Sequence, residues 1–312
     1  MIRLLESSSL SVRRLDIHRS TFCHWLQRYQ DNGVDGLEDR KSTPTVAWKQ
    51  IPLDHRDAII ELALDKPELS PRELAARYTD QQAYFVSEST VYRLLKAQDL
   101  ITSPAYILMQ AGDTFQHPSK RVNELWQTDF TYFKIIGWGW YYLSTILDDY
   151  SRFIVAWRLC TSMSASDVSD TLGDALCFAG LDQVKVRHKP RLLSDNGPCY
   201  ISAELSGYLQ EYGMTHTRGR PYHPQTQGKI ERWHQTLKNR VLLENYYLPG
   251  DLEMQIGAFV DHYNNHRYHE SLANVTPGDV YFGRDTAIIE RRKMIKKLTI
   301  QNRRLNHQSK AA

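Results

Sequence analysis

The stretch Trp126-Gln127-Thr128-Asp129-Phe130-Thr131-Tyr132 alternates aromatic side chains with smaller or polar ones. Successive side chains of a β-strand point to opposite faces, so Trp126, Phe130 and Tyr132 share one face and Asp129 lies on the other. We therefore expect a strand over residues 123–135. Its aromatic face is expected to pack into a core, while its opposite face presents a carboxylate.

Two further acidic residues stand in contexts that suit an active site. Asp195 ends a short apolar run and precedes an Asn-Gly turn, and the carboxyl ends of strands in α/β sheets are where ligands usually bind. Glu231 lies near the start of a helical pattern whose apolar stripe is expected to dock on the sheet, with His234 and Lys238 on a neighbouring polar face. The stripe consists of Ile230, Trp233, Leu237 and Val241.

Carboxylates held close together repel one another, and burial raises their pKa values. Divalent cations remove that cost, and hard oxygen ligands suit Mg²⁺ or Mn²⁺. Two such ions about 4 Å apart can activate a nucleophilic oxygen and stabilise the departing one in a displacement at phosphorus. Asp129, Asp195 and Glu231 are therefore candidate catalytic residues and candidate ligands of two Mg²⁺ or Mn²⁺ ions. The alternative is three unrelated surface acids.

Five segments of the chain have a distinctive sequence. They are Trp126–Asp129, Leu147–Trp157, Ser194–Gly197, His223–Arg232, and Tyr263–His269 with Thr276-Pro277 beyond it. With these segments, residues 123–282 resemble the bacterial insertion-sequence transposases whose catalytic core is related to retroviral integrases. The resemblance implies an α/β ribonuclease-H-like core, a mixed sheet flanked by helices, preceded by all-α helix-turn-helix units.

The resemblance also implies an activity and partners. The expected reaction is metal-dependent DNA cleavage at the ends of an element, followed by strand transfer of the freed 3′-hydroxyl. The expected partner is double-stranded DNA, both element ends and target. Because two ends must be brought together, a homodimer or higher oligomer on DNA is expected. The alternatives are an inactive or repurposed transposase that only binds DNA and, in the same fold, a ribonuclease H.

The chain is predicted to contain five successive parts. They are a helix-turn-helix-like unit (1–45), a second such unit (53–100), a linker (101–120), the catalytic core (121–283) and a basic tail (284–312). Nine Lys or Arg residues and two acids between Arg284 and Lys310 give the tail a charge of +7. The tail either contacts phosphates non-specifically or is a frayed, solvated helix.

Helical patterns and basic residues mark the candidate DNA contacts. In the first unit a short helix over Ser11–Leu15 precedes one over Arg19–Gln30. In the second unit helices are expected over 53–65, 71–78 and 87–97, and hydroxyl and basic side chains on the last suit phosphate and base-edge contacts. A plain three-helix bundle would show the same apolar spacing. The candidate DNA-binding residues are Arg19, Arg28, Ser89, Thr90, Arg93, Arg218, Arg220, Lys229 and Lys238.

Within the core, the stretch from Tyr212 to Ile230 contains no acidic residue and is rich in glycine and proline, which indicates a cationic loop beside the carboxylates. Asp148 and Asp149 are interpreted as structural. The histidines at 262, 266 and 269 are interpreted as packing residues, with a zinc site as the alternative. Strands are predicted over 141–148, 153–160, 190–195 and 214–218, and helices over 165–179, 202–212, 226–244 and 251–266.

Composition adds an expected location. The four cysteines are scattered, which suggests reduced thiols of the cytosol, and no apolar run is long enough to span a membrane. We therefore expect a cytoplasmic, nucleoid-associated protein with no membrane partner.

Overall fold

The computed structural model describes residues 18–38, 50–101, 119–182, 188–219, 227–242, 246 and 248–311. The chain divides into two compact units, residues 1–50 with 304–312 and residues 51–303. The helix predicted over Ser11–Leu15 and most of the predicted linker 101–120 lie outside the described residues. Among those that are described, no helix combines the length and the apolar character needed to cross a bilayer.

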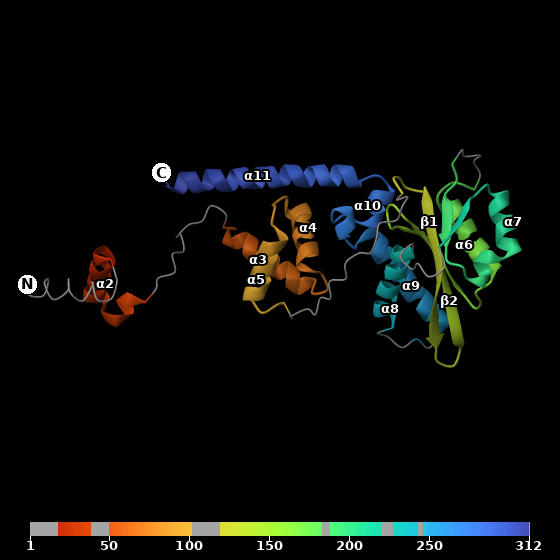
Figure 1. Cartoon of the computed structure of the whole chain (residues 1–312), viewed down its shortest axis with the longest axis horizontal. Coiled ribbons are helices and arrows are strands. Elements are labelled where there is room, and N and C mark those ends of the chain that lie inside the picture. Colours follow the sequence, from red (N-terminus) through yellow and green to blue (C-terminus); the bar gives the residue numbers. More distant parts are fainter. Residues whose placement is uncertain are drawn as a thin grey trace, which may run out of the picture. The chain divides into compact units, whose positions relative to one another are not determined.

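The described part of the larger unit is centred on a mixed sheet of five strands. They are β1 (Leu125–Ile135), β2 (Gly139–Asp148), β3 (Ile154–Cys160), β4 (Arg191–Ser194) and β5 (His216–Arg218). The strand order is β3-β2-β1-β4-β5, with β1, β2 and β3 antiparallel and β4 and β5 added in parallel (Figure 1). Gly137 and Gly139, with φ of 84° and 99°, let the chain turn between β1 and β2.

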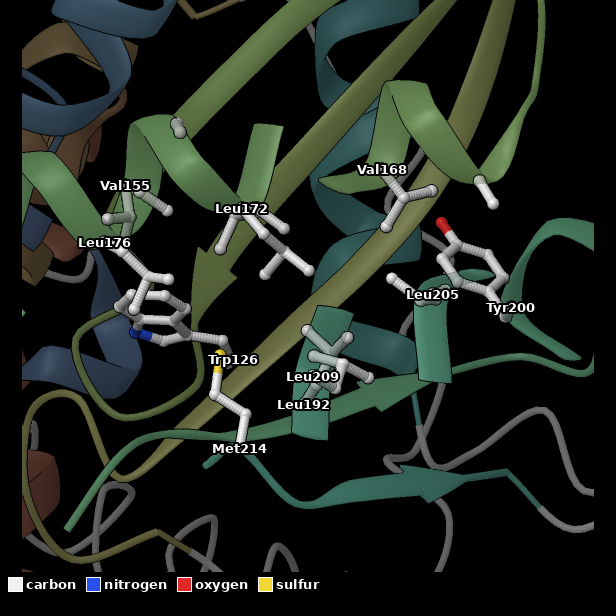
Figure 2. Close-up of a cluster of buried hydrophobic side chains, with 14 of the residues drawn as sticks. Trp126, Val155, Val168, Leu172, Leu176, Leu192, Tyr200, Leu205, Leu209 and Met214 are labelled. Carbon is white, nitrogen blue, oxygen red and sulfur yellow. The ribbon is translucent and has the colours of Figure 1, made fainter. Parts of the chain in front are cut away.

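One face of the sheet is covered by α6 (Ala165–Phe178) and α7 (Ala203–Glu211). Helix α6 begins at a capping box in which Ser164 accepts from the backbone of Asp167 and the Asp167 side chain accepts from that of Ser164. Figure 2 shows apolar side chains of α6 and α7 gathered over Trp126 of β1 and Leu192 of β4. This face forms the first of two cores around the sheet.

The opposite face is covered by α8 (Gly228–Val241) and α9 (Pro249–Asn265), which pack on Phe133 and Ile135 of β1. All four residues of the predicted stripe on α8 are at most 3% exposed, so that prediction is confirmed. The alternation along β1 places Asp129 on the face that α8 covers. The strand therefore separates an apolar core on one side from the candidate site on the other.

One expectation for β1 is wrong. Tyr132 was expected to pack with Trp126 and Phe130, but it is 54% exposed. Phe130 packs against the cluster under α6 and α7, whereas Tyr132 lies beyond that cluster. Figure 1 shows the β1–β2 hairpin extending past the short strands β4 and β5. Strand β1 thus continues further than the core that covers its aromatic face.

The helices before the sheet confirm the predicted all-α character. In the smaller unit α2 (Arg19–Asn32) is followed by the 3₁₀ helix η1 (Gly33–Leu37). In the larger unit α3 (Leu53–Asp65), α4 (Pro71–Gln82) and α5 (Glu88–Ala97) enclose a small core of their own. Together with the flanked mixed sheet, these helices give the ribonuclease-H-like core and preceding all-α units that the sequence predicts.

After α9 come η4 (Glu270–Leu272), α10 (Pro277–Tyr281) and α11 (Asp285–Ala311), and α11 contains most of the predicted basic tail. Arg292 of α11 donates two hydrogen bonds to Asp80 of α4, at 2.7 and 2.6 Å, and Thr299 accepts one from Phe85 N at 3.0 Å. Ile295 and Thr299 are buried. One side of α11 is therefore a packed, hydrogen-bonded element, and Arg292 is already paired with a carboxylate.

Candidate active site

The sheet brings Asp129 and Asp195 onto neighbouring strands. Gln127 of β1 pairs with Leu193 of β4 in parallel register, so each acid lies two residues beyond that pair. Glu231 lies in the first turn of α8, the helix that packs over the same face of β1. A strand, the tip of a second strand and the start of a helix thus supply the three carboxyl groups, here called the acidic triad.

Asp129 acts electrostatically on both other members of the triad. The pKa of Asp195 is raised, first by desolvation and then by the negative charge of Asp129. The pKa of Glu231 is raised by the same two causes, while His234 opposes the shift. A like charge disfavours ionisation only at short range. Asp129 is therefore the member of the triad whose charge acts on both of the others.

The donor chemistry of the triad fits divalent cations. Carboxylate oxygens are the hard ligands that Mg²⁺ and Mn²⁺ prefer, and added positive charge would relieve the repulsion that raises the pKa values of Asp195 and Glu231. Among the residues that the structure describes, no three His, Cys, Asp or Glu side chains lie close enough to form a metal-binding group. The triad side chains must therefore converge further for all three to hold ions together.

A buried glutamine fixes where α8 begins. Gln127 is 2% exposed, its Oε1 accepts from Ile230 N at 3.2 Å, and its Nε2 donates to Asp149 Oδ1 at 2.8 Å. Ile230 directly precedes Glu231, so this side chain ties the backbone of Glu231 to the strand that carries Asp129.

Lys229 completes the same network. Its Nζ lies 2.8 Å from Asp149 Oδ1 and donates to Asp149 O at 2.7 Å. Asp149 is 4% exposed, so this cation compensates a carboxylate inside the protein. Gln227, just before α8, directs its side-chain amide at the carbonyl oxygens of Thr128 and Leu193, 3.4 Å from each. The start of α8 is therefore tied to both strands that carry triad residues.

The Asn-Gly pair after β4 orients Asp195. Gly197 N donates to Asp195 Oδ1 at 2.9 Å, and a Cβ at Gly197 would lie 3.0 Å from that oxygen. Asn196 Nδ2 donates to Gly219 O at 2.8 Å, which ties this turn to the segment after β5. Glycine is thus suited to a position where the backbone approaches the carboxylate closely.

The position of His234 on α8 suggested that it lies on a polar face, but in the structure its side chain is buried. It is 6% exposed, with Nδ1 3.5 Å from Asp129 Oδ2. Its Nε2 is buried without a hydrogen-bond partner among the described residues. His234 follows Ile230 by four residues, one helical turn, so it borders the apolar stripe and is buried with it. The stripe indicates the direction of the buried face but not its width.

Asp148 and Asp149 both have structural partners, as the sequence interpretation favoured. Asp148 is fully buried and accepts from Ser151 N at 2.8 Å, Ser151 Oγ at 2.6 Å and Asn123 N at 2.8 Å. Burial raises its pKa, and these hydrogen bonds oppose that shift. Asp149 is bound to Lys229 and Gln127 as described above.

Comparison with known protein families identifies the core. Residues 119–224 and residues 212–277 each match the integrase core domain family, and together the matches span about half of the chain. Residues 119–277 form an integrase core domain. Residues 21–95 match the homeodomain-like domain family, which covers α2 to α5.

Similar proteins include transposases and retroviral polyproteins. The chain is 28% identical over 190 residues to the transposase for insertion sequence element IS629 of Shigella sonnei, covering 60% of this chain and 62% of that protein. It is 35% identical over 118 residues to the Gag-Pro-Pol polyprotein of squirrel monkey retrovirus, covering 38% of this chain and 6% of the polyprotein. The chain thus spans less than two thirds of the length of these relatives.

Solved structures of retroviral integrases are also similar. The catalytic core domain of BIV integrase is 27% identical, with a TM-score of 0.38, covering 53% of this chain and 97% of that one. The catalytic core domain of HTLV-2 integrase, in complex with magnesium, is 21% identical with a TM-score of 0.41, covering 52% and 97% respectively.

Of the basic residues predicted to bind DNA in the integrase core, Arg218 is exposed at the end of β5. Lys238 lies on α8 with its Nζ 4.3 Å from the centre of the Tyr132 ring. Lys229 is in the ion pair with Asp149, and Arg220 lies outside the described residues. Arg218 and Lys238 thus lie on two different elements of the core.

The candidates before the integrase core lie on two helices. Ser89 and Arg93 are exposed on α5, where Arg93 Nε donates to Ser89 O at 3.0 Å. Thr90 Oγ1 lies 2.8 Å from Ser87 Oγ, beside the start of that helix. Arg28 of α2 donates to Glu38 O at 2.5 Å, and Arg19 is the first residue of α2.

Sequence reasoning did not find the residues that position the triad. Gln127 and Gln227 are polar side chains within or beside apolar segments, and a single sequence gives them no functional signal. Lys229 and Asp149 are far apart in the chain, so their pairing is visible only in the fold. One available signal was Gln127 on the same strand face as Asp129, two residues away.

The raised pKa of Asp195 predicts that this carboxylate destabilises the metal-free protein. A carboxyl group whose pKa is higher in the folded than in the unfolded state costs stability when ionised, and this cost disappears as pH falls through the raised pKa. Asn keeps an oxygen that accepts from Gly197 N. Asp195→Asn should therefore raise the melting temperature at neutral pH in chelator, by on the order of 1 °C because the residue is exposed.

The matched control for this measurement is Asp167→Asn. Burial raises the pKa of Asp167, but hydrogen bonds from Ser162 and Ser164 outweigh it and leave the pKa lowered. That substitution should lower the melting temperature at neutral pH. Thermal unfolding of both variants at neutral and acidic pH checks the pair. A lower melting temperature for Asp195→Asn at neutral pH contradicts the argument.

Proposed function

We propose that the chain is a transposase that cleaves DNA at the ends of a mobile element and joins the freed 3′-hydroxyl to a second DNA. The observation that carries the proposal is the acidic triad: β1, the turn after β4 and the start of α8 supply Asp129, Asp195 and Glu231 in an integrase core, and the charge of Asp129 raises the pKa of the other two. A cytoplasmic, nucleoid-associated location follows from a DNA substrate.

The triad is proposed to hold two Mg²⁺ or Mn²⁺ ions. When bound, such ions supply the positive charge that activates a water oxygen and stabilises the departing oxygen at phosphorus. The residues of the chain bind and orient: the Gln127 network holds α8 against β1, and the turn after β4 directs Asp195. Since the same three groups serve cleavage and joining, no serine or tyrosine nucleophile is required.

DNA is proposed to bind through the helical units and through cations around the triad. Ser89 and Arg93 on α5 are exposed where base edges and phosphates could be contacted. Arg218 on β5 and Lys238 on α8 are the proposed phosphate contacts of the core. Two element ends must be held together for strand transfer, so a homodimer or a higher oligomer is proposed to act on DNA.

The test uses a plasmid that carries the genomic DNA from both sides of the coding region. The full chain with Mg²⁺ or Mn²⁺ should nick this plasmid at fixed positions, leave 3′-hydroxyl ends and produce joined products, with no reaction in chelator. An RNA–DNA hybrid of the same sequence should not be cut. Cleavage of the hybrid alone would indicate a ribonuclease H, and DNA binding with no nicking in either metal would indicate a binding protein without catalysis.

A further inference from the structure

The β1–β2 hairpin combines many aromatic residues with an absence of acidic ones. Between Phe130 and Leu147 the sequence contains seven aromatic residues and no Asp or Glu, and Lys134 is its one charged residue. A surface hairpin ordinarily carries charges of both signs for solubility. The composition of this segment is therefore suited to a partner that offers flat apolar surfaces and negative charge.

Two exposed aromatic residues of this hairpin, Tyr132 and Trp140, lie on one face. Lys134 pairs with Trp140 and Tyr132 pairs with Tyr142, and residues directly opposite each other on antiparallel strands point to the same face. Tyr132 is 54% exposed and Trp140 is 50% exposed, since this is the face that the core under α6 and α7 does not reach. The other face of the hairpin is buried under α8 and α9.

The side chains on this face already contact one another. The rings of Tyr132 and Trp140 meet edge to face, with centroids 5.4 Å apart. Lys238 Nζ lies 4.3 Å from the Tyr132 ring centre, and Lys134 Nζ lies 5.5 Å from that of Trp140. Two rings and two ammonium groups thus form a small surface, here called the hairpin platform. Within the part of the chain that the structure describes, its cations are held by cation–π contacts and by no carboxylate.

The platform is connected to the acidic triad by two elements. Tyr132 follows Asp129 by three residues of β1, about 10 Å along a strand, and its side chain points to the opposite face of the sheet. Lys238 follows Glu231 by seven residues of α8, about 10 Å along a helix. Strand β4 pairs with β1 only over Leu125–Gln127, so among the described strands none covers that edge of β1 beyond the triad. Lys238 of α8 can therefore reach Tyr132 past the open edge.

We propose that the hairpin platform binds unpaired nucleotides of a DNA strand that is held at the triad. Bases stack on Tyr132 and Trp140, while Lys134 and Lys238 contact phosphates. A base that stacks on Tyr132 displaces the Lys238 ammonium from the ring, and the phosphate of that nucleotide is its new partner. The proposal rests on the proposed function, since it assigns the substrate a position next to the cleavage site.

An unpaired strand fits this surface better than a duplex or a second copy of the chain. In a duplex the faces of the bases are already stacked, whereas unpaired bases offer them to aromatic side chains. A second copy would bring the same positive charges of Lys134 and Lys238 together without a carboxylate between them. The length of about 10 Å corresponds to a few nucleotides, so the contact reaches DNA that flanks the cleaved phosphate.

The experiment measures binding of the full chain to a single-stranded oligonucleotide of about 20 nucleotides and mixed sequence, and to its blunt duplex, in chelator so that no cleavage occurs. Tyr132→Ala and Trp140→Ala should each weaken single-strand binding by about tenfold, since stacking of this strength is lost. Tyr132→Phe and Trp140→Phe should bind within about twofold of the unchanged protein because a ring remains. Duplex binding should change little in all four variants.

Two controls separate stacking from general damage. Tyr208→Ala removes one ring of the Tyr208–Tyr212 pair, whose centroids lie 4.7 Å apart, and Tyr208 lies within α7. It should leave single-strand binding unchanged. Lys134→Ala should reduce the slope of log affinity against log salt concentration by about 0.7, the value for one phosphate on a single strand. Tyr132→Ala and Trp140→Ala should leave that slope unchanged.

The outcomes are distinct. The proposal is overturned if Tyr132→Ala and Trp140→Ala both bind single strands as tightly as the unchanged protein does. It is also overturned if these two variants lose the same affinity for single strands and for duplex. A shift in the oligomeric state of Tyr132→Ala or Trp140→Ala, measured by light scattering, would instead indicate that the platform is an interface between copies of the chain. The assay contains no divalent metal, so a chain that fails to nick DNA can still bind through the platform. Failure of the proposed function and failure of this inference are therefore told apart.

Discussion

Replacing Asp129 with Asn is expected to reduce DNA nicking by about 10³-fold or more, roughly 4 kcal/mol of activation free energy. Asn has nearly the same size and shape, so the sheet and its register should persist. What is lost is the charge at the centre of the triad, the one that acts on both Asp195 and Glu231. Without it, the remaining two carboxylates can no longer hold a pair of divalent ions.

The measurement is plasmid nicking in Mg²⁺ and in Mn²⁺, with binding of duplex DNA in chelator measured in parallel. Binding should be unchanged, because Asp129 is not among the proposed DNA contacts. Asp170→Asn is the matched control: Asp170 is an exposed acid on α6 that pairs with Arg158 at 3.2 Å, away from the triad. It should nick at the normal rate. Nicking by the Asp129 variant in Mg²⁺ would refute the catalytic assignment.

Gln127→Leu is expected to have the second largest effect, on both stability and activity. Leucine has a similar volume but leaves Ile230 N without its acceptor and removes the amide that donates to buried Asp149. An unsatisfied buried donor costs about 1–3 kcal/mol, so the free energy of unfolding should fall by about 2 kcal/mol. Nicking should fall by about 10²-fold, because the start of α8 no longer holds Glu231 at its distance from Asp129.

Chemical denaturation and nicking assays below the unfolding transition measure these two effects. Gln235→Leu is the control, since it makes the same change at an exposed position of α8. It should alter neither quantity appreciably. If Gln127→Leu lowers stability but nicks DNA normally, the glutamine supports the fold and does not position Glu231.

The periodicities of the sequence predict most of the elements of the core. The strand predicted over 123–135 is β1 (Leu125–Ile135), and the helix predicted over 165–179 is α6 (Ala165–Phe178). These elements are buried on one face, so their apolar residues recur with the period of the structure. Local patterns also place Asp195 after a strand and Glu231 near the start of a helix.

Local patterns fail where burial depends on a neighbour that is distant in sequence. Tyr132 continues the alternation of β1, but no core covers it at that end of the strand. His234 lies beside the apolar stripe and is buried because α8 packs more closely on β1 than the stripe implies. The pairing of Lys229 with Asp149 joins residues 80 positions apart, so it requires the complete sheet.

The basic tail shows a similar limit. Its charge suggests either phosphate contacts or a solvated helix, and neither alternative includes a partner within the chain. In the structure Arg292 binds Asp80, and Thr299 binds the backbone of Phe85. The carboxylate that compensates Arg292 lies 212 residues earlier, so no window of sequence around the tail could show it.

The central claim is that Asp129, Asp195 and Glu231 jointly hold catalytic divalent ions. The most direct test is a calorimetric titration of Mn²⁺ into the full chain bound to duplex DNA, with the Asp129→Asn variant titrated in the same way. We expect saturable uptake of two ions per chain by the unchanged protein and loss of that uptake in the variant. No uptake by the unchanged protein, or equal uptake by both, would contradict it.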